Sequence, residues 1–455
     1  MLKILNKKLF FVTLLVTITT STVNAQPISF KQAWSILQAK NNSLAAQRAN
    51  VEHYKQLQEA SDALNYPSIS LSANYSRLDD TNEDISDTLT SMLPSAFSAY
   101  SSLITSASFA EEDAMNASID AFWAIYTGGK ITAAQDYSEA KSEEAKAKLE
   151  METQSRYEDL SKFYYTVVLA KGVLKTRKTV EEGLKKHRDF SIKLEQQGQI
   201  AKVERLQADA SLAKAVVDRK KSEMDLEIAT SALTEVLNQN NKVIPESNLF
   251  INDSLPNLTL FTEQTIETFP GLDVLTAKQK QAESSIKAEK SKYHPQVYLY
   301  SNYVLYQGDT LADNLTPDWY AGIGINVPLF DNSGRSEKVQ AAQSSVLQVR
   351  YLYQQAIQDL SVLVKKTYFS AQQAIEEAQG LDASLALAQE NLKLRVKAFN
   401  QGLSTSVEVV DAELFLASIK IQQQVAKFNY VIALNKLLSL SSEMTTFSDY
   451  EASAI

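Results

Sequence analysis

An internal duplication is the feature of this sequence that most constrains its fold. A shift of 204 residues superimposes Gln197-Gly198 on Gln401-Gly402. Earlier in each half the shift is 228 residues, which carries Pro67 to Pro295. The difference of 24 residues places an insertion in the first half, before Tyr126. Because a duplicated order of segments indicates a duplicated architecture, we expect two matched halves, 26–240 and 271–440.

Each half reads as helix, strand, loop, strand, long helix, turn and helix. The predicted strands are about 67–78 and 118–126 in the first half, and about 296–306 and 319–329 in the second. Apolar and polar residues alternate along each, with Tyr and Trp near the ends, which is typical of strands in an outer-membrane barrel. An ordinary half-buried hairpin shows the same alternation, so these segments alone leave both structures open.

Long helices account for most of the mass. The chain has only 12 Gly and 9 Pro in 455 residues, so it runs far between turns. We expect helices over 130–197 and 333–400, with returning helices over 201–238 and 405–440. Their heptad-like apolar spacing favours side-by-side packing. The helices alone would also fit a soluble coiled-coil rod.

Two glycines mark the predicted helix reversals. Gly198 and Gly402 stand where a helix must end, and glycine supplies the positive φ of that position.

The first 25 residues predict a secretory signal peptide. Lys3, Lys7 and Lys8 precede an apolar stretch, and Ala25 ends a cleavage-site pattern. A membrane anchor is the alternative, but the apolar run is too short to span about 30 Å. After Ala25 no run reaches 18 apolar residues, so a membrane role would need strands. Four strands cannot close a barrel around a channel, whereas three chains would supply twelve.

Composition and motifs argue against most other functions. The chain has no Cys and three scattered His, which exclude disulfides, thiol catalysis and Cys-ligated zinc. The net charge of −9 has the wrong sign for a nucleic-acid partner. Gly128-Gly129-Lys130 lacks phosphate-loop spacing and predicts a structural turn. The acidic segment 79–116 predicts a solvated extracellular loop without a site. We therefore expect no enzyme activity, no cofactor and no metal site.

Seven segments together resemble the TolC-like outer-membrane efflux protein family. They cover nearly the whole mature chain, and the more specific pieces are the VPLFD-x-x-G turn and the stretch after the second long helix. The segments are 29–51, 65–78, 122–130, 196–215, 293–303, 324–335 and 399–422.

The resemblance implies a mainly α-helical trimeric channel-tunnel. Its shared twelve-stranded β-barrel would lie in outer-membrane lipid of a Gram-negative bacterium, joined to a helical barrel in the periplasm. Residues 241–270 and the tail 441–455 would form a partial equatorial domain. The partners implied are a periplasmic adaptor (a membrane fusion protein) and an inner-membrane pump of RND, ABC or MFS type, in efflux or type I secretion.

The resemblance also implies a gate at the periplasmic end. Glu408 and Asp411 match the family's inward-pointing acids, and repulsion among six carboxylates in a trimer should raise some of their pKa values. A single solvated helix face is the alternative for this pair. Phe399 and Ser404 stand where the family often has Tyr and Arg, so the closed state cannot use the same network. Glu204 matches an acidic position beside the same mouth, and we expect it to act in a latch.

The helix tips are the predicted adaptor-docking site. The tips are marked by Gly198 and Gly402, and Lys202 and Arg205 lie close enough in sequence to pair with Glu204. Reversing the charge of Lys202 or Arg205 should weaken docking. A periplasmic adaptor or coiled-coil scaffold outside the membrane is the alternative function, although it explains the matched strands poorly.

Overall fold

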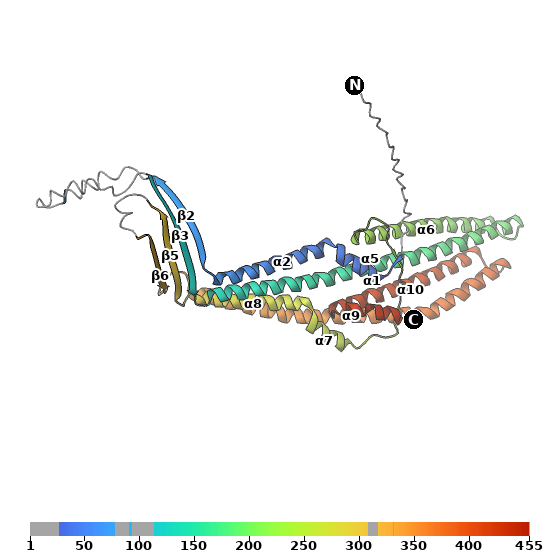
Figure 1. Cartoon of the computed structure of the whole chain (residues 1–455). Helices are drawn as coiled ribbons and strands as arrows, with labels where there is room; N and C mark the ends of the chain where they lie inside the picture. The colour runs from blue at the N-terminus through green and yellow to red at the C-terminus, as the bar shows by residue number, and fades with distance from the viewer. Residues whose placement is uncertain (1–26, 78–90, 93–112, 308–316, 331, 455) are drawn as a thin grey trace, which may run out of the picture.

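A four-stranded sheet stands at one end of a bundle of long helices in the computed structural model (Figure 1). The structure describes residues 27–77, 91–92, 113–307, 317–330 and 332–454, so the predicted signal peptide and most of the predicted acidic loop lie outside the described residues. Helices α5 (Lys130–Gln196) and α9 (Arg335–Asn400) run from the sheet to the far end of the bundle. At about 1.5 Å per residue, each is roughly 100 Å long.

The remaining helices complete two matched halves. In the bundle away from the sheet, the order across the molecule is α6, α5, α10 and α9 (Figure 1). Among the described residues, none of the helices combines the length and apolar character needed to cross a membrane. The further helical elements are α1 (Phe30–Lys40), α2 (Asn42–Asp62), η1 (Ala63–Asn65), α6 (Lys202–Val236), α7 (Leu258–Thr268), α8 (Pro270–Ser291), α10 (Ser406–Leu440), η4 (Met444–Thr446) and α11 (Phe447–Ala452).

Two helices precede each pair of strands where the sequence pattern predicts one, and the first of the second pair, α7, lies in the 241–270 segment. Asn41 ends α1 in an extended conformation, and its side-chain oxygen accepts a hydrogen bond from the Leu44 N–H at 3.0 Å to start α2. In the second half, Pro270 occupies the first turn of α8, where its missing N–H costs nothing. A single residue that favours a helix start, Asn41 or Pro270, therefore divides each helical stretch into two helices.

The sheet is antiparallel throughout, in the order β2-β3-β5-β6. Its strands are β2 (Ser68–Arg77), β3 (Asp113–Tyr126), β5 (Gln296–Tyr306) and β6 (Trp319–Asn326).

Two strand boundaries differ from the predicted ones. β3 begins at Asp113 instead of 118, because its first residues pair with the outer end of β2, from Arg77↔Asp113 onward. β6 ends at Asn326 instead of 329, and Pro328 beyond it has no N–H to donate to a ladder.

The sheet has one apolar face and one polar face. Directly opposite residues share a face, so the pairs Leu71↔Ile119 and Leu299↔Ile323 belong to a single surface. Most of this apolar surface is exposed in the single chain: Ile69, Leu71, Tyr75, Met115, Ile119, Trp123, Leu299, Tyr303, Trp319, Ile323 and Ile325. Serine, asparagine and tyrosine dominate the opposite face.

An aromatic core lies at mid-height of the molecule. The ring of Phe30 contacts those of Tyr157, Tyr164, Tyr165 and Phe447 with centroids 5.2–5.5 Å apart. All five side chains are buried. This core joins the N-terminal α1, the middle of α5 and the C-terminal α11.

The connector between the halves contacts the first described residues and the C-terminal tail. β1 (Pro27–Ile28) pairs in parallel with β4 (Ile244–Pro245). The amide of Asn252 donates to the Tyr450 carbonyl at 3.1 Å. Residues of the 241–270 segment and of the 441–455 tail, predicted to form one domain, are therefore in contact.

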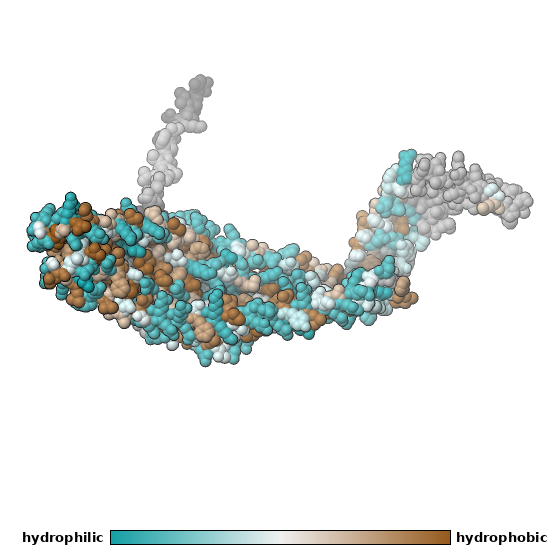
Figure 2. Space-filling model, turned by 180° about the vertical axis from the view of Figure 1, so that it is seen from behind, coloured by the Kyte–Doolittle hydropathy of each residue, from teal (hydrophilic) through white to brown (hydrophobic). Residues whose placement is uncertain are grey.

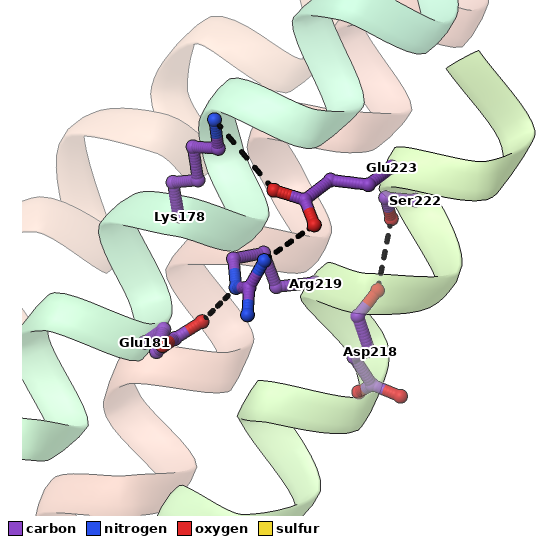
Figure 3. Close-up of polar contacts among 6 residues, drawn as sticks. All are labelled: Lys178, Glu181, Asp218, Arg219, Ser222 and Glu223. Carbon is purple, nitrogen blue, oxygen red and sulfur yellow. Dashed lines mark hydrogen bonds and ion pairs between the residues drawn. The ribbon is translucent and has the colours of Figure 1, made fainter. Parts of the chain in front are cut away.

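Charged seams hold neighbouring helices together. Arg219 of α6 pairs with Glu181 of α5 and with Glu223 of its own helix, while Lys178 of α5 lies 3.8 Å from Glu223 (Figure 3). Nearer the sheet, Glu144 of α5 is almost fully buried and is bonded by Lys148 and by Gln281 of α8 at 2.7 and 2.8 Å.

Replacing Glu144 with glutamine should weaken the α5–α8 seam. Burial raises the pKa of Glu144, but the bonds from Lys148, Gln281 and Lys141 outweigh it and lower the pKa from 4.5 to about 2. The stabilising effect is therefore complete above pH 4.5 and disappears as the pH falls towards 2. We expect the free energy of unfolding at pH 7, measured with urea, to fall by about 1–3 kcal/mol in Glu144→Gln.

The neighbouring Glu143→Gln is the matched control. Glu143 is exposed and pairs with Lys280 on the surface, so its replacement should change the unfolding free energy little. Equal effects of the two substitutions would contradict a special role for Glu144.

Candidate functional site

Both helical hairpins reverse at glycine, as the sequence predicts. Gly198 has φ +73° and Gly402 has φ +75°, which favour glycine over any residue with a Cβ. The next N–H in each turn, of Gln199 or Leu403, donates 2.9 Å back to a carbonyl of the helix just ended. These bonds satisfy the last carbonyls of α5 and α9 and fix the start of the returning helices.

Four helices meet just inside the two tips. His187 of α5 lies 2.7 Å through Nε2 from the Ser406 hydroxyl, at the start of α10. The Ser406 N–H donates to the Glu204 carboxylate of α6 at 2.7 Å. Phe399, near the end of α9, packs its ring on His187 with centroids 4.6 Å apart. We call His187, Glu204, Phe399 and Ser406 the tip cluster.

The tip cluster is largely shielded from water. Ser406 has no exposed surface, Phe399 is 2% exposed and His187 is 9% exposed. Burial lowers the pKa of His187 below its usual 6.5, although the charge of Glu204 opposes this shift. His187 is therefore neutral at neutral pH, and Glu204 caps the helix of the other repeat.

Acidification should loosen the tip cluster. Because the pKa of His187 is lower in the folded protein, the stabilising effect is complete above about pH 6.5 and is lost as the pH falls below that value. We expect hydrogen exchange of the first α10 amides, corrected for intrinsic rates, to quicken several-fold between pH 7.5 and 5.5. In His187→Gln, which keeps a donor for Ser406, this increase should disappear. An identical increase in the variant would show that another group titrates.

Glu408 caps the N-terminus of its own helix, α10. Its carboxylate accepts bonds from the Ser404 hydroxyl at 2.5 Å and the Thr405 N–H at 3.0 Å, in a capping box that begins α10. Arg395 of α9 pairs with it at 3.1 Å. The Ser404 bond first, then the Thr405 N–H, lowers the pKa of Glu408, and Arg395 lowers it further. In the single chain this direction is opposite to the rise expected from repulsion between acids.

Asp411 lies one turn further along α10 and is exposed. Among the described residues it has no ion pair. It lines a groove of about 290 Å³ between α5, α6 and α10, with Arg177, Lys214 and Asp218. The structure therefore gives Glu408 and Asp411 different surroundings.

The predicted pairing of Arg205 or Lys202 with Glu204 is wrong. Arg205 instead pairs with Glu195 at the end of α5, at 2.6 Å, and with Asp209 on its own helix. Among the described residues Lys202 has no ion pair within 4.0 Å, and Glu204 accepts the Ser406 N–H. The carboxylate of Glu204 therefore joins helices and is not neutralised by its neighbours in sequence.

Sequence reasoning missed three residues of this region. His187 and Ser406 come together from 219 positions apart, and no local pattern predicts that contact. Arg395 supplies the positive charge beside Glu408 from the preceding helix, whereas Ser404 has no charge to give. A search for basic residues about two helical turns before Gly402 could have found Arg395.

Comparison with known proteins shows which family has this architecture. The sequence model of the family described as Outer membrane efflux protein matches residues 34–239 and 262–442, which are the two halves. No match is found among curated protein sequences.

Several solved structures share the fold at low sequence identity. The outer membrane protein VceC from Vibrio cholerae is similar with a TM-score of 0.74 and 13% identity, over 90% of this chain and 96% of that one. The open state of the Neisseria gonorrhoeae outer membrane channel MtrE has a TM-score of 0.73 and 17% identity, over 91% and 89%. CusC, studied for folding and transmembrane channel formation, has a TM-score of 0.76 and 16% identity, over 91% and 92%.

These likenesses show the channel-tunnel type of fold, and the family match covers most of the sequence in two blocks. The resemblance seen in the sequence segments is thereby confirmed. The chain belongs to the outer membrane efflux protein family.

Proposed function

We propose that three copies of this chain form a passive exit duct across the outer membrane of a Gram-negative bacterium. The sheet is the main support for this proposal. It exposes an apolar face, and it leaves β2 and β6 each with one unpaired edge in the described chain. Unpaired edges are not tolerated in lipid, so β6 of one copy would pair with β2 of the next. Three copies would then close twelve strands into a barrel.

The helical body supports the same assembly. α6 and α9 form opposite edges of the tip half of the bundle, and both carry exposed apolar side chains in helical spacing (Figure 1). Figure 2 shows apolar residues breaking up the polar surface of this body. Such stripes need a partner, and α9 of a second copy is long enough to cover the whole of α6. The residues concerned are Val203, Val217, Met224 and Ile228 of α6, and Val362, Phe369, Leu387 and Leu394 of α9.

The tip cluster and the Glu408–Arg395 pair would act as the periplasmic gate. The bonds from His187 and Glu204 to Ser406 tie α10 to α5 and α6, so an outward movement of α9 and α10 would have to break them. The Arg395–Glu408 pair would keep α9 and α10 together during this movement. Asp411 would add negative charge at the mouth. After cleavage of the signal peptide near Ala25, an inner-membrane pump of RND, ABC or MFS type would deliver cargo through a periplasmic adaptor, in efflux or type I secretion.

Membrane extraction followed by electron microscopy tests the proposal. Detergent-extracted outer membranes should yield three-fold cylinders with a helical stalk of roughly 100 Å. Reconstituted into planar bilayers, these particles should conduct ions. A protein that washes off in alkaline carbonate and forms rods without a barrel end would instead support the adaptor or scaffold function.

The adaptor should dock at the tips, since the α5–α6 turn and the α9–α10 turn lie at the same end of the bundle (Figure 1). Lys202 is the first residue of α6, directly after the turn at Gly198. Lys202→Glu should lower affinity for the cognate adaptor several-fold, mainly through slower association. Surface plasmon resonance would measure it, with Lys220→Glu, further along the same helix, as the control of equal charge. Arg205→Glu is a poorer probe, because it also breaks the pair with Glu195. Unchanged association by Lys202→Glu would contradict docking at this tip.

A further inference from the structure

An aromatic patch lies on the polar face of the sheet and extends from the helix-joining ends of β3 and β5 to the opposite end of β6. Phe122 of β3 contacts Tyr298 of β5 with ring centroids 5.2 Å apart. Tyr298 and Tyr300 are 6.0 Å apart, and Tyr300 and Tyr320 of β6 are 6.2 Å apart. We call these four residues the aromatic patch. Phe122, Tyr300 and Tyr320 are 40–49% exposed, so their rings are open to solvent.

Glycines on β6 set the position of two of these rings. Tyr300 stands opposite Gly322 and Tyr298 stands opposite Gly324 in the ladder. A Cβ at Gly324 would come within 2.3 Å of the Tyr298 ring, and one at Gly322 within 2.8 Å of the Tyr300 ring. The rings therefore lie against the backbone of β6. Covering glycine accounts for Tyr298 and Tyr300. Phe122 and Tyr320 cover no glycine, since their ladder partners are Ser68 and Tyr300 for Phe122 and Asn302 for Tyr320.

A carboxylate borders the aromatic patch. Asp120, two residues before Phe122, accepts bonds from Asn302 at 2.7 Å, from Ser72 at 3.0 Å and from Ser118 at 3.1 Å. These donors come from β5, β2 and β3, so three strands hold the carboxylate in place. Within the described parts of the four strands, Asp120 is the one charged side chain on this face.

We propose that the aromatic patch and Asp120 form a transit site for planar aromatic cations on the inner wall of the channel. This inference rests on the proposed function, because closing the barrel with its apolar face in lipid turns the polar face to the lumen. Open ring faces offer stacking and attract cations, and the carboxylate adds an opposite charge at one edge. A planar anion gains the stacking but meets repulsion from Asp120, and a non-aromatic cation gains only the charge.

Current through single reconstituted trimers tests this site. Ethidium, a planar aromatic cation, is added on the barrel side, and its interruptions of the current give a dissociation constant. Pyrenesulfonate and tetraethylammonium serve as the aromatic anion and the non-aromatic cation. We expect ethidium to block at least fivefold more tightly than either. Asp120→Asn, Phe122→Ser and Tyr320→Ser should each weaken its block at least fivefold.

Controls place the block at the patch and separate this inference from the proposed function. Asn74→Ala, on the same face of β2 but away from the rings, should leave ethidium block unchanged. The full open current of each variant shows that it has assembled. Full current with equal block by all three probes, or block unaffected by the patch variants, would overturn the transit site alone. A wild-type protein without channel current would overturn the proposed function and the transit site together.

Discussion

Replacing Glu204 with alanine should open the narrow end of the duct. The carboxylate of Glu204 caps α10 through the Ser406 N–H and stands beside His187, so its loss frees the first turn of α10 from α6. Loss of a helix cap costs about 0.5–2 kcal/mol, which is roughly a 2- to 30-fold change in an equilibrium. In planar bilayers, the fraction of time that Glu204→Ala spends in its high-conductance state should rise within this range.

Two further substitutions separate capping from charge. Glu204→Gln keeps an oxygen that accepts the Ser406 N–H, so it should open less often than Glu204→Ala. Lys202→Ala changes the same helical turn, but among the described residues the Lys202 side chain makes no ion pair or hydrogen bond, so this variant should conduct like the wild type. Unchanged conductance of Glu204→Ala would remove Glu204 from the latch.

The substitution Leu71→Arg should prevent the chain from assembling in the outer membrane. Leu71 is 70% exposed on the apolar face of β2, within the ten paired residues of that strand. Placing Arg on the lipid face near the middle of the bilayer costs about 2–4 kcal/mol per chain. A trimer carries three such charges, so the amount of heat-stable trimer in outer-membrane fractions should fall more than tenfold.

The neighbouring residue provides the matched control. Ser70 precedes Leu71 on the same strand and points to the opposite face, where water would fill the lumen. Ser70→Arg should therefore assemble nearly as well as the wild type. Equal loss in both variants would mean that the two faces do not differ in environment, and it would contradict the barrel.

Most of the fold could be predicted because its signals are local and repeated. Period-two alternation predicted all four strands, and β5 has the predicted bounds of 296–306. The first residues of β3 were missed because partner residues on β2 decide where a ladder ends, and the sequence of β3 alone does not show them. The break at Asn41 was missed because one capping side chain interrupts an otherwise helical stretch.

The site could be predicted less well, because its contacts join helices that are distant in sequence. The duplication pointed to Glu204 and Glu408 as equivalent positions. The structure shows that they differ: Glu408 caps its own helix, whereas Glu204 caps the helix of the other repeat. His187 is one of three histidines scattered along the sequence, and only its 2.7 Å contact with Ser406 distinguishes it from the other two.

The aromatic core at mid-height has a consequence for how the chain matures. Phe30 and its partner Phe447 are 417 positions apart in the sequence. Because a chain is synthesised from its N-terminus, Tyr157, Tyr164 and Tyr165 become available to Phe30 long before α11 supplies Phe447. The aromatic core is therefore completed only when α11 docks, which makes this short helix the closing element of the fold.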